Sequence, residues 1–134
     1  MKDSILFDRI LYMAKCALDG LARRQEIVAR NIANVDTPGY KALEVDFDHY
    51  LAQAVERHRR VRLDVRREGH IAGLDLAGIV PIRPRRTGSL RADGNNVDID
   101  TELADLAEIG VRYQAVSQAA SKKLLLLKEI ATRR

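Results

Sequence analysis

Histidine and cysteine are the side chains here best suited to bind metals or act in catalysis. The three histidines, His49, His58 and His70, are separated by 9 and 12 residues, so no pair has the i, i+4 spacing that places two ligands on one helical face. The single cysteine, Cys16, can form neither an internal disulfide nor a thiolate metal cage. The sequence also contains no glycine-rich phosphate loop and no Gly-x-Ser-x-Gly motif. We therefore expect a protein that is not an enzyme and has no catalytic residues, metal, cofactor or small-molecule ligand.

A second group of polar residues, from Asp93 to Asp100, has the acidic character of a calcium-binding loop. Its glycine follows the first aspartate, however, and the Asp-x-Asp-x-Asp-Gly order is missing. A turn with positive φ at Asp-Gly-Asn-Asn fits better, with Asp100 as the N-cap of a following helix. We assign this segment to the start of the C-terminal helix, with the residues Asp93, Gly94, Asn95, Asn96, Val97, Asp98 and Asp100.

The basic residues gather in the middle of the chain. Ten arginines and three acidic residues lie between Arg57 and Arg91, a net charge of +7 in a chain of +4, which leaves −3 for the rest. This stretch contains no aromatic residue for base stacking. A solvated loop, or contact with an acidic surface of a neighbouring subunit, explains it most simply. A helical nucleic-acid-binding or adapter module is the alternative; a membrane-surface protein fits least, because the arginines lie off the long helices.

The elements that position these residues are mainly helical. The chain has 134 residues, only 4% of them aromatic, which favours one domain with a helical seam over an aromatic-rich core. We expect neither a membrane span nor a cleaved signal peptide. Heptad stripes predict one helix from Asp3 or Ser4 to about Asn34 and a second from Asp100 onward. Their apolar positions are Phe7, Leu11, Ala14, Leu18, Leu21, Val28 and Ile32 in the first, and Leu106, Ile109, Tyr113, Val116, Ala120, Leu124, Leu127 and Ala131 in the second.

The segment between these helices is predicted to be irregular. A short amphipathic helix is expected over about 46–57, and alternation in Val61 to Val65 indicates a strand that could belong to a small β-hairpin. Gly20 and Gly110 lie within the long helices, where they indicate a close approach or a bend, or are simply tolerated. Four consecutive leucines, Leu124 to Leu127, cover every side of the last helix, which a single partner within the chain cannot bury.

The residues after the first helix carry a resemblance to a known family. The run Asn31-Ile32-Ala33-Asn34-Val35-Asp36-Thr37-Pro38-Gly39-Tyr40-Lys41 resembles the signature of bacterial flagellar axial proteins of the rod and hook. Within that group, the segment from Asp93 to Glu102, followed by Tyr113-Gln114-Ala115, is similar to proximal rod subunits. We expect the motif to form a rigid elbow through Asn31, Ile32, Ala33, Asn34, Thr37, Pro38, Gly39 and Tyr40.

The resemblance implies an architecture and a structural function. The two helices would form an antiparallel coiled-coil pair, so that residues 1–40 and 97–134 make one helical core and 41–96 an Arg-rich middle segment. The chain would be a rod subunit that assembles helically and transmits motor torque. Subunit packing would fall to Leu11, Leu18, Val28, Ile32, Leu106, Tyr113, Leu124, Leu125 and Leu127.

The resemblance also implies partners and a location. The partners would be further copies of this chain, other flagellar rod proteins, the rod-base adapter protein FliE, the MS ring and the flagellar type III export apparatus, with no nucleic acid among them. The location would be the rod of the flagellar basal body within the periplasm, reached by export without signal cleavage.

Overall fold

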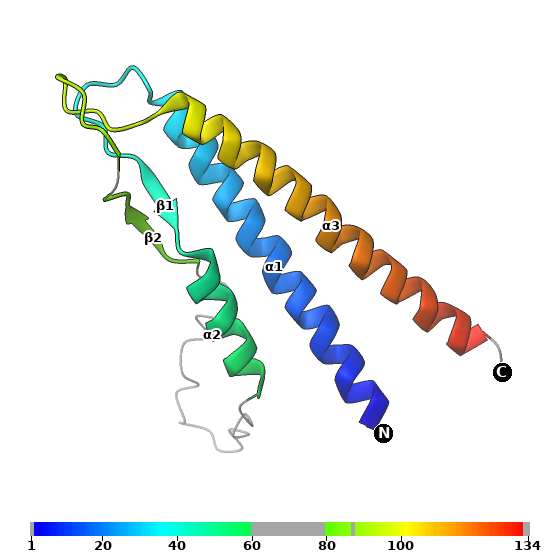
Figure 1. Ribbon diagram of the computed structural model, residues 1–134. Helices are drawn as coiled ribbons and strands as arrows, with labels where there is room; N and C mark the ends of the chain where they lie inside the picture. Colours follow the sequence, from blue (N-terminus) through cyan, green and yellow to red (C-terminus); the bar gives the residue numbers. More distant parts are fainter. Residues whose placement is uncertain (1, 60–79, 87, 133–134) are drawn as a thin grey trace, which may run out of the picture.

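The computed structural model describes residues 2–59, 80–86 and 88–132. Three helices and two short strands follow one another along the chain (Figure 1). They are α1 (Lys2–Ala33), β1 (Leu43–Val45), α2 (Phe47–Arg59), β2 (Ile82–Pro84) and α3 (Ile99–Thr132). The prediction of a mainly helical chain with two long terminal helices is confirmed, and so is the short helix between them. The strand expected at 61–65 lies outside the described residues.

Helices α1 and α3 run antiparallel and lie side by side nearest the elbow (Figure 1). Toward the two chain ends they diverge, so the N- and C-termini lie apart at the same end of the molecule. The shared core consists of Leu21, Val28 and Ile109. Four partly buried side chains pack against this cluster: Ile32, Phe47, Leu106 and Val116. The predicted heptad positions nearest the elbow therefore form the core.

Helix α2 packs on α1 at a glycine. A Cβ atom built at Gly20 would lie 2.9 Å from Cε2 of Phe47 and 3.0 Å from Cε1 of Tyr50. The two rings therefore occupy the space that any side chain at position 20 would need. The same construction at Gly110 meets nothing within 4 Å. Close approach explains the first glycine, whereas the second is merely tolerated within the chain.

The two strands form a small antiparallel sheet. Leu43 pairs with Pro84, Glu44 with Arg83 and Val45 with Ile82. The N–H of Arg85 extends the ladder by donating to the carbonyl of Ala42 over 2.7 Å. These strands come from segments separated by α2 and the residues after it, so the pairing is not a local hairpin. The sequence predicts a small β-hairpin, whereas these two strands lie on either side of α2.

The half of α3 farthest from the elbow is poorly covered. Leu124, Leu125 and Leu126 are 52%, 60% and 53% exposed, and Ile130 is 65% exposed. None of the helices in the described part of the chain combines the length and the hydrophobicity that a membrane span requires. An apolar surface is thus left on a helix that extends beyond the core.

Candidate functional site

The elbow begins where α1 ends, close to the predicted position. Backbone N–H groups of Asn34 and Val35 donate to the carbonyls of Asn31 and Ile32, at 3.0 and 3.2 Å, which tightens the last turn. Pro38 then prevents the helix from continuing, and Gly39 adopts φ 72°, a left-handed conformation. The chain reverses here, as the motif predicts.

Asn31 is the central side chain of the elbow and has no exposed surface. Its amide nitrogen donates to the carbonyl of Leu43 at 2.8 Å, and its amide oxygen accepts from the N–H of Leu43 at 2.9 Å. The same nitrogen lies 3.1 and 3.2 Å from the two carboxylate oxygens of Glu102, and the hydroxyl of Tyr40 donates to the oxygen at 3.2 Å. Asn31 therefore connects α1, β1 and α3, using its amide nitrogen as a donor and its amide oxygen as an acceptor.

Asn34, the other asparagine of the motif, has a local role. Its amide nitrogen donates to the carbonyl of Arg30 at 2.8 Å, and its amide oxygen accepts from the hydroxyl of Thr37 at 3.2 Å. Both bonds stay within the helix end and the turn. The remaining motif residues are Ile32, which is half-buried against the core, and Ala33 and Pro38, which are exposed.

Asn95 closes the elbow from the segment before α3. Its buried amide nitrogen lies 3.0, 3.0 and 2.9 Å from the carbonyl oxygens of Asn34, Val35 and Thr37. Its amide oxygen accepts from the N–H of Val97 at 2.7 Å. These carbonyls belong to the turn that follows α1, so a side chain from a distant part of the chain holds this turn in place.

Asn96 joins this segment to the sheet. Its amide oxygen accepts from the N–H of Ala42 at 2.7 Å, and its amide nitrogen donates to the carbonyl of Arg85 at 3.3 Å. Gly94, with φ 81°, forms the positive-φ turn that the sequence predicts. The N–H of Gly39 donates to the carbonyl of Asp93 at 2.9 Å, which joins the two turns directly.

Glu102 places a carboxylate where none of its surface is exposed. Arg85 Nη1 donates to it at 2.8 Å, in addition to the amide of Asn31. Burial raises the pKa of Glu102 above its ordinary value of 4.5, and the hydrogen bonds from Asn31 and the charge of Arg85 oppose this rise. Charging this carboxylate therefore depends on the two side chains that face it.

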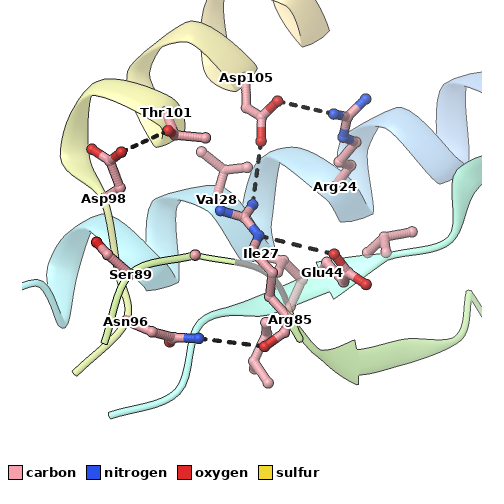
Figure 2. Close-up of a pocket in the computed structure, with 13 residues that line it drawn as sticks. Arg24, Ile27, Val28, Glu44, Arg85, Ser89, Asn96, Asp98, Thr101 and Asp105 are labelled. Atoms are coloured by element: carbon pink, nitrogen blue, oxygen red, sulfur yellow. Dashed lines mark hydrogen bonds and ion pairs between the residues drawn. The ribbon is translucent and has the colours of Figure 1, made fainter. Parts of the chain in front are cut away.

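A groove of about 440 Å³ lies beside this cluster, between α1, the sheet and the start of α3 (Figure 2). Arg85 reaches across it, with Nη2 3.3 Å from Asp105 and Nε 3.9 Å from Glu44. Arg24 of α1 reaches the same Asp105 at 3.1 Å. Figure 2 shows the guanidinium group of Arg85 between the acidic side chains of the two flanking elements. The groove is thus lined mainly by groups that bond one another.

The N-cap of α3 is Asp98, and the prediction of Asp100 for this position is wrong. Asp98 accepts from the N–H of Asp100 at 3.1 Å and from the hydroxyl of Thr101 at 2.9 Å. The hydrogen bond from Thr101, together with the backbone bonds, lowers the pKa of Asp98 below its ordinary 3.8. The two aspartates are two residues apart in an acidic stretch, so the sequence alone did not distinguish them.

Several arginines of the basic stretch have acidic partners within the chain. Arg83 contacts Glu44 at 2.8 Å and Asp46 at 3.2 Å, and Arg91 lies 3.6 Å from Asp93. The side chains from 57 to 79 lie outside the described residues. The sequence suggested that these arginines contact an acidic surface of a neighbouring subunit. For Arg83 and Arg85, the acidic partners lie in the same molecule.

The residues expected to carry subunit packing divide into two groups. Val28, Ile32 and Leu106 pack in the core of this chain. Tyr113 is 40% exposed and Leu124 and Leu125 are more so, while Leu11, Leu18 and Leu127 are partly exposed. The second group leaves apolar surface uncovered by the described part of this chain. Over the described part of the chain, no group of three or more His, Cys, Asp or Glu side chains could hold a metal ion.

Sequence reasoning missed the roles of Arg85 and Glu102. The sequence places Glu102 only at the end of the segment that resembles proximal rod subunits, and Arg85 only among the ten arginines of the basic stretch. A glutamate at the edge of the α3 apolar stripe, four residues before Leu106, was the one available signal. Its buried partner comes from a segment without periodicity, which only the fold could place.

Comparison with known proteins finds relatives that match most of the chain. The family described as "Flagella basal body rod protein" matches residues 11–41, which comprise most of α1 and the elbow. The flagellar basal body rod protein FlgB of Bacillus subtilis is 33% identical over 127 residues, covering 95% of this chain and 96% of that protein. FlgB of Salmonella typhimurium is 37% identical over 118 residues, covering 80% of this chain and 81% of the relative.

The chain belongs to the FlgB family of flagellar basal body rod proteins. It is therefore a structural subunit of the basal-body rod, from a family of structural proteins rather than enzymes, and it assembles with other rod and basal-body proteins. The comparisons do not support the alternative of a nucleic-acid-binding or adapter module. In this rod protein the matched residues include the elbow, in which Asn31 makes the bonds between segments and Asn34 makes local ones.

Proposed function

We propose that this subunit forms the proximal part of the rod by helical assembly with copies of itself and with other rod proteins, and that it transmits motor torque. The observation that carries the proposal is the apolar surface of α3 formed by Leu124, Leu125, Leu126 and Ile130, which we call the leucine belt. Each member is more than half exposed. Burying such a surface is favourable at roughly 25 cal/mol per Å² of apolar area.

The distribution of the belt residues around α3 favours contact with several neighbouring subunits rather than with one. Successive helical residues are turned by about 100°, so consecutive leucines face different directions. Leu124, Leu125 and Leu126 are all more than half exposed, so none of these directions is covered by the described part of the chain. Coiled-coil packing of the terminal helices, with Leu11, Leu18, Tyr113 and Leu127 contributing, would then arise between subunits as well as within one.

The elbow provides the stiffness that torque transmission needs. Buried amides of Asn31, Asn95 and Asn96 bond backbone atoms of segments that are distant in sequence. In the described residues, every buried side-chain nitrogen and oxygen has a hydrogen-bond partner. We infer that residues 1–40 and 97–134 act as one helical core, which carries residues 41–96 as a lobe.

The remaining partners and the location follow from family membership as proposals. They are the adapter FliE and the MS ring at the base of the rod, and the flagellar type III export apparatus during delivery. The rod would lie in the periplasm. The described helices and small sheet hold no disulfide, which suits a chain that is exported unfolded.

The first test is genetic. A strain lacking this chain should be non-motile, and electron microscopy of its purified basal bodies should show rings without a rod. The intact gene should restore the rod. Normal rods in the deletion strain would contradict the proposal.

A second test addresses the leucine belt. Leu125→Asp should give a chain of near-normal helicity by circular dichroism that fails to assemble and does not restore motility. Ser121→Asp, an equal charge on an exposed polar position of the same helix, is the matched control and should restore motility. Full motility with Leu125→Asp would count against the belt as an assembly surface.

A further inference from the structure

The small sheet and α3 are joined mainly through side chains. The main neighbours of β1 are α1 and β2, whereas α3 packs chiefly on α1. Arg85, one residue beyond β2, crosses the remaining space. Its backbone N–H bonds Ala42 of the sheet, and its guanidinium bonds Glu102 and Asp105 of α3. One residue thus belongs to the sheet by its backbone and to α3 by its side chain.

The bond between Arg85 and Glu102 is deeply buried. The side chain of Arg85 is 13% exposed and that of Glu102 is 0% exposed. A buried carboxylate is costly to charge, and removing its cationic partner leaves that cost uncompensated. Asp105, in contrast, keeps Arg24 as a second partner at 3.1 Å. Glu102 is therefore the member of the cluster that requires Arg85.

Glu102 also connects α3 to α1. Its carboxylate accepts from Asn31, and the same amide of Asn31 bonds both backbone groups of Leu43. A closed circuit results, from the sheet through Arg85 and Glu102 to Asn31 and back to the sheet. Displacing any one member removes a hydrogen-bond partner from a buried polar group of the next.

We propose that Arg85 and Glu102 form a latch that couples the packing of the sheet to the packing of α3. The two elements would then unfold locally and refold as one cooperative unit. The latch is a property of the single chain. If neighbours cover α3 as in the proposed function, the latch would also stabilise the sheet in the assembled rod. Both residues act as positioning residues.

The test separates coupling from simple stability. Arg85→Met alone should unfold the chain readily, because Glu102 would lose its cation. The double variant Arg85→Met/Glu102→Leu removes both charges and should regain much of that stability, since replacing both members of a buried ion pair by apolar residues is often neutral. The double variant should nevertheless lose the coupling between the opening of the sheet and the opening of α3. Arg86→Met, at the exposed neighbouring arginine, is the matched control.

The readout is native-state hydrogen exchange on the full chain. In the wild type and in Arg86→Met, the amides of Leu43 and Arg85 should open together with those of Leu106 and Ile109, within about twofold in protection. In the double variant, the sheet amides should exchange about tenfold or more faster than the α3 amides. Should the double variant not fold, Arg85→Lys, which cannot reach both carboxylates, should show a smaller separation of the same kind.

Two results would overturn the latch. One is a wild type in which sheet and α3 amides already open separately. The other is a variant, double or Arg85→Lys, in which they still open together. Both results are measured on the isolated chain, so they do not depend on whether the leucine belt drives rod assembly.

Discussion

The side chain of Asn31 pairs with the backbone of Leu43 as a neighbouring strand would, donating to its carbonyl at 2.8 Å and accepting from its N–H at 2.9 Å. The outer edge of β1 is thereby satisfied by a helix rather than by a third strand. The neighbouring pair, Ala42 and Arg85, is hydrogen-bonded, and Pro84 opposite Leu43 has no N–H. Because hydrogen-bonded and non-bonded pairs alternate in an antiparallel sheet, the backbone groups of Leu43 point away from β2 and toward α1. The elbow motif thus ends a helix and also seats the sheet.

Replacing Asn31 by alanine should be among the most damaging changes in the elbow. The change leaves the N–H and carbonyl of Leu43 without the bonds that Asn31 supplies and removes one of the two donors to the buried carboxylate of Glu102, whose other donor is Arg85. This should cost about 3 kcal/mol or more of unfolding free energy. Asn34→Ala, which removes only local bonds, is the control and should cost about 1 kcal/mol or less. Urea denaturation measures both, and equal losses would show that the bonds of Asn31 across segments carry no special weight.

Asn95→Asp should destabilise the chain at neutral pH although it preserves size. The substitution places a carboxylate oxygen against the carbonyls of Asn34, Val35 and Thr37, where the amide now donates. We expect a loss of about 2 kcal/mol or more in unfolding free energy at pH 7. Part of this loss should be recovered in acid, where a protonated aspartate can donate again. A loss that does not change between pH 7 and pH 4 would contradict this role of Asn95.

Gly20→Ala and Gly110→Ala should change stability in opposite directions. At Gly20 the new methyl group would meet the rings of Phe47 and Tyr50 at 2.9 and 3.0 Å, so α2 must shift, at a cost of about 1–3 kcal/mol. At Gly110 there is open space, and the higher helix propensity of alanine should add up to about 1 kcal/mol. Thermal unfolding distinguishes the two, and a more stable Gly20→Ala variant would refute close packing at that site.

Glu102 and Asp98 should contribute to the pH dependence of stability with opposite signs. The pKa of Glu102 is raised above 4.5, so the folded state holds this proton more tightly, and the contribution to stability falls as pH rises above that value. The pKa of Asp98 is lowered below 3.8, so its contribution is present above that value and is lost as pH falls.

The measurement compares each carboxylate with its amide. The stability of wild type relative to Glu102→Gln should decrease as pH rises from 4 toward neutrality. The stability of wild type relative to Asp98→Asn should decrease as pH falls from 5 toward 2.5. Curves with the same sign for both pairs would mean that burial does not govern the ionisation of Glu102.

The sequence by itself determined the helices and the turn between them. Heptad spacing located α1 and α3, and the i, i+3, i+4 pattern beginning at Phe47 located α2, because helical periodicity is a local property of the chain. Pro38 and Gly39 fixed the end of α1, and Gly94 fixed the later turn, because their backbone restrictions also need no distant partner.

Only the tertiary structure decided which distant groups meet. The pairing of β1 with β2 joins three-residue strands separated by a whole helix, too short for an alternation signal. The circuit through Asn31, Arg85 and Glu102 joins side chains far apart in sequence, among many similar arginines and acids. A buried hydrogen bond forms only where the fold brings a donor and an acceptor within about 3 Å of each other. The spacing of residues along the sequence does not reveal that distance.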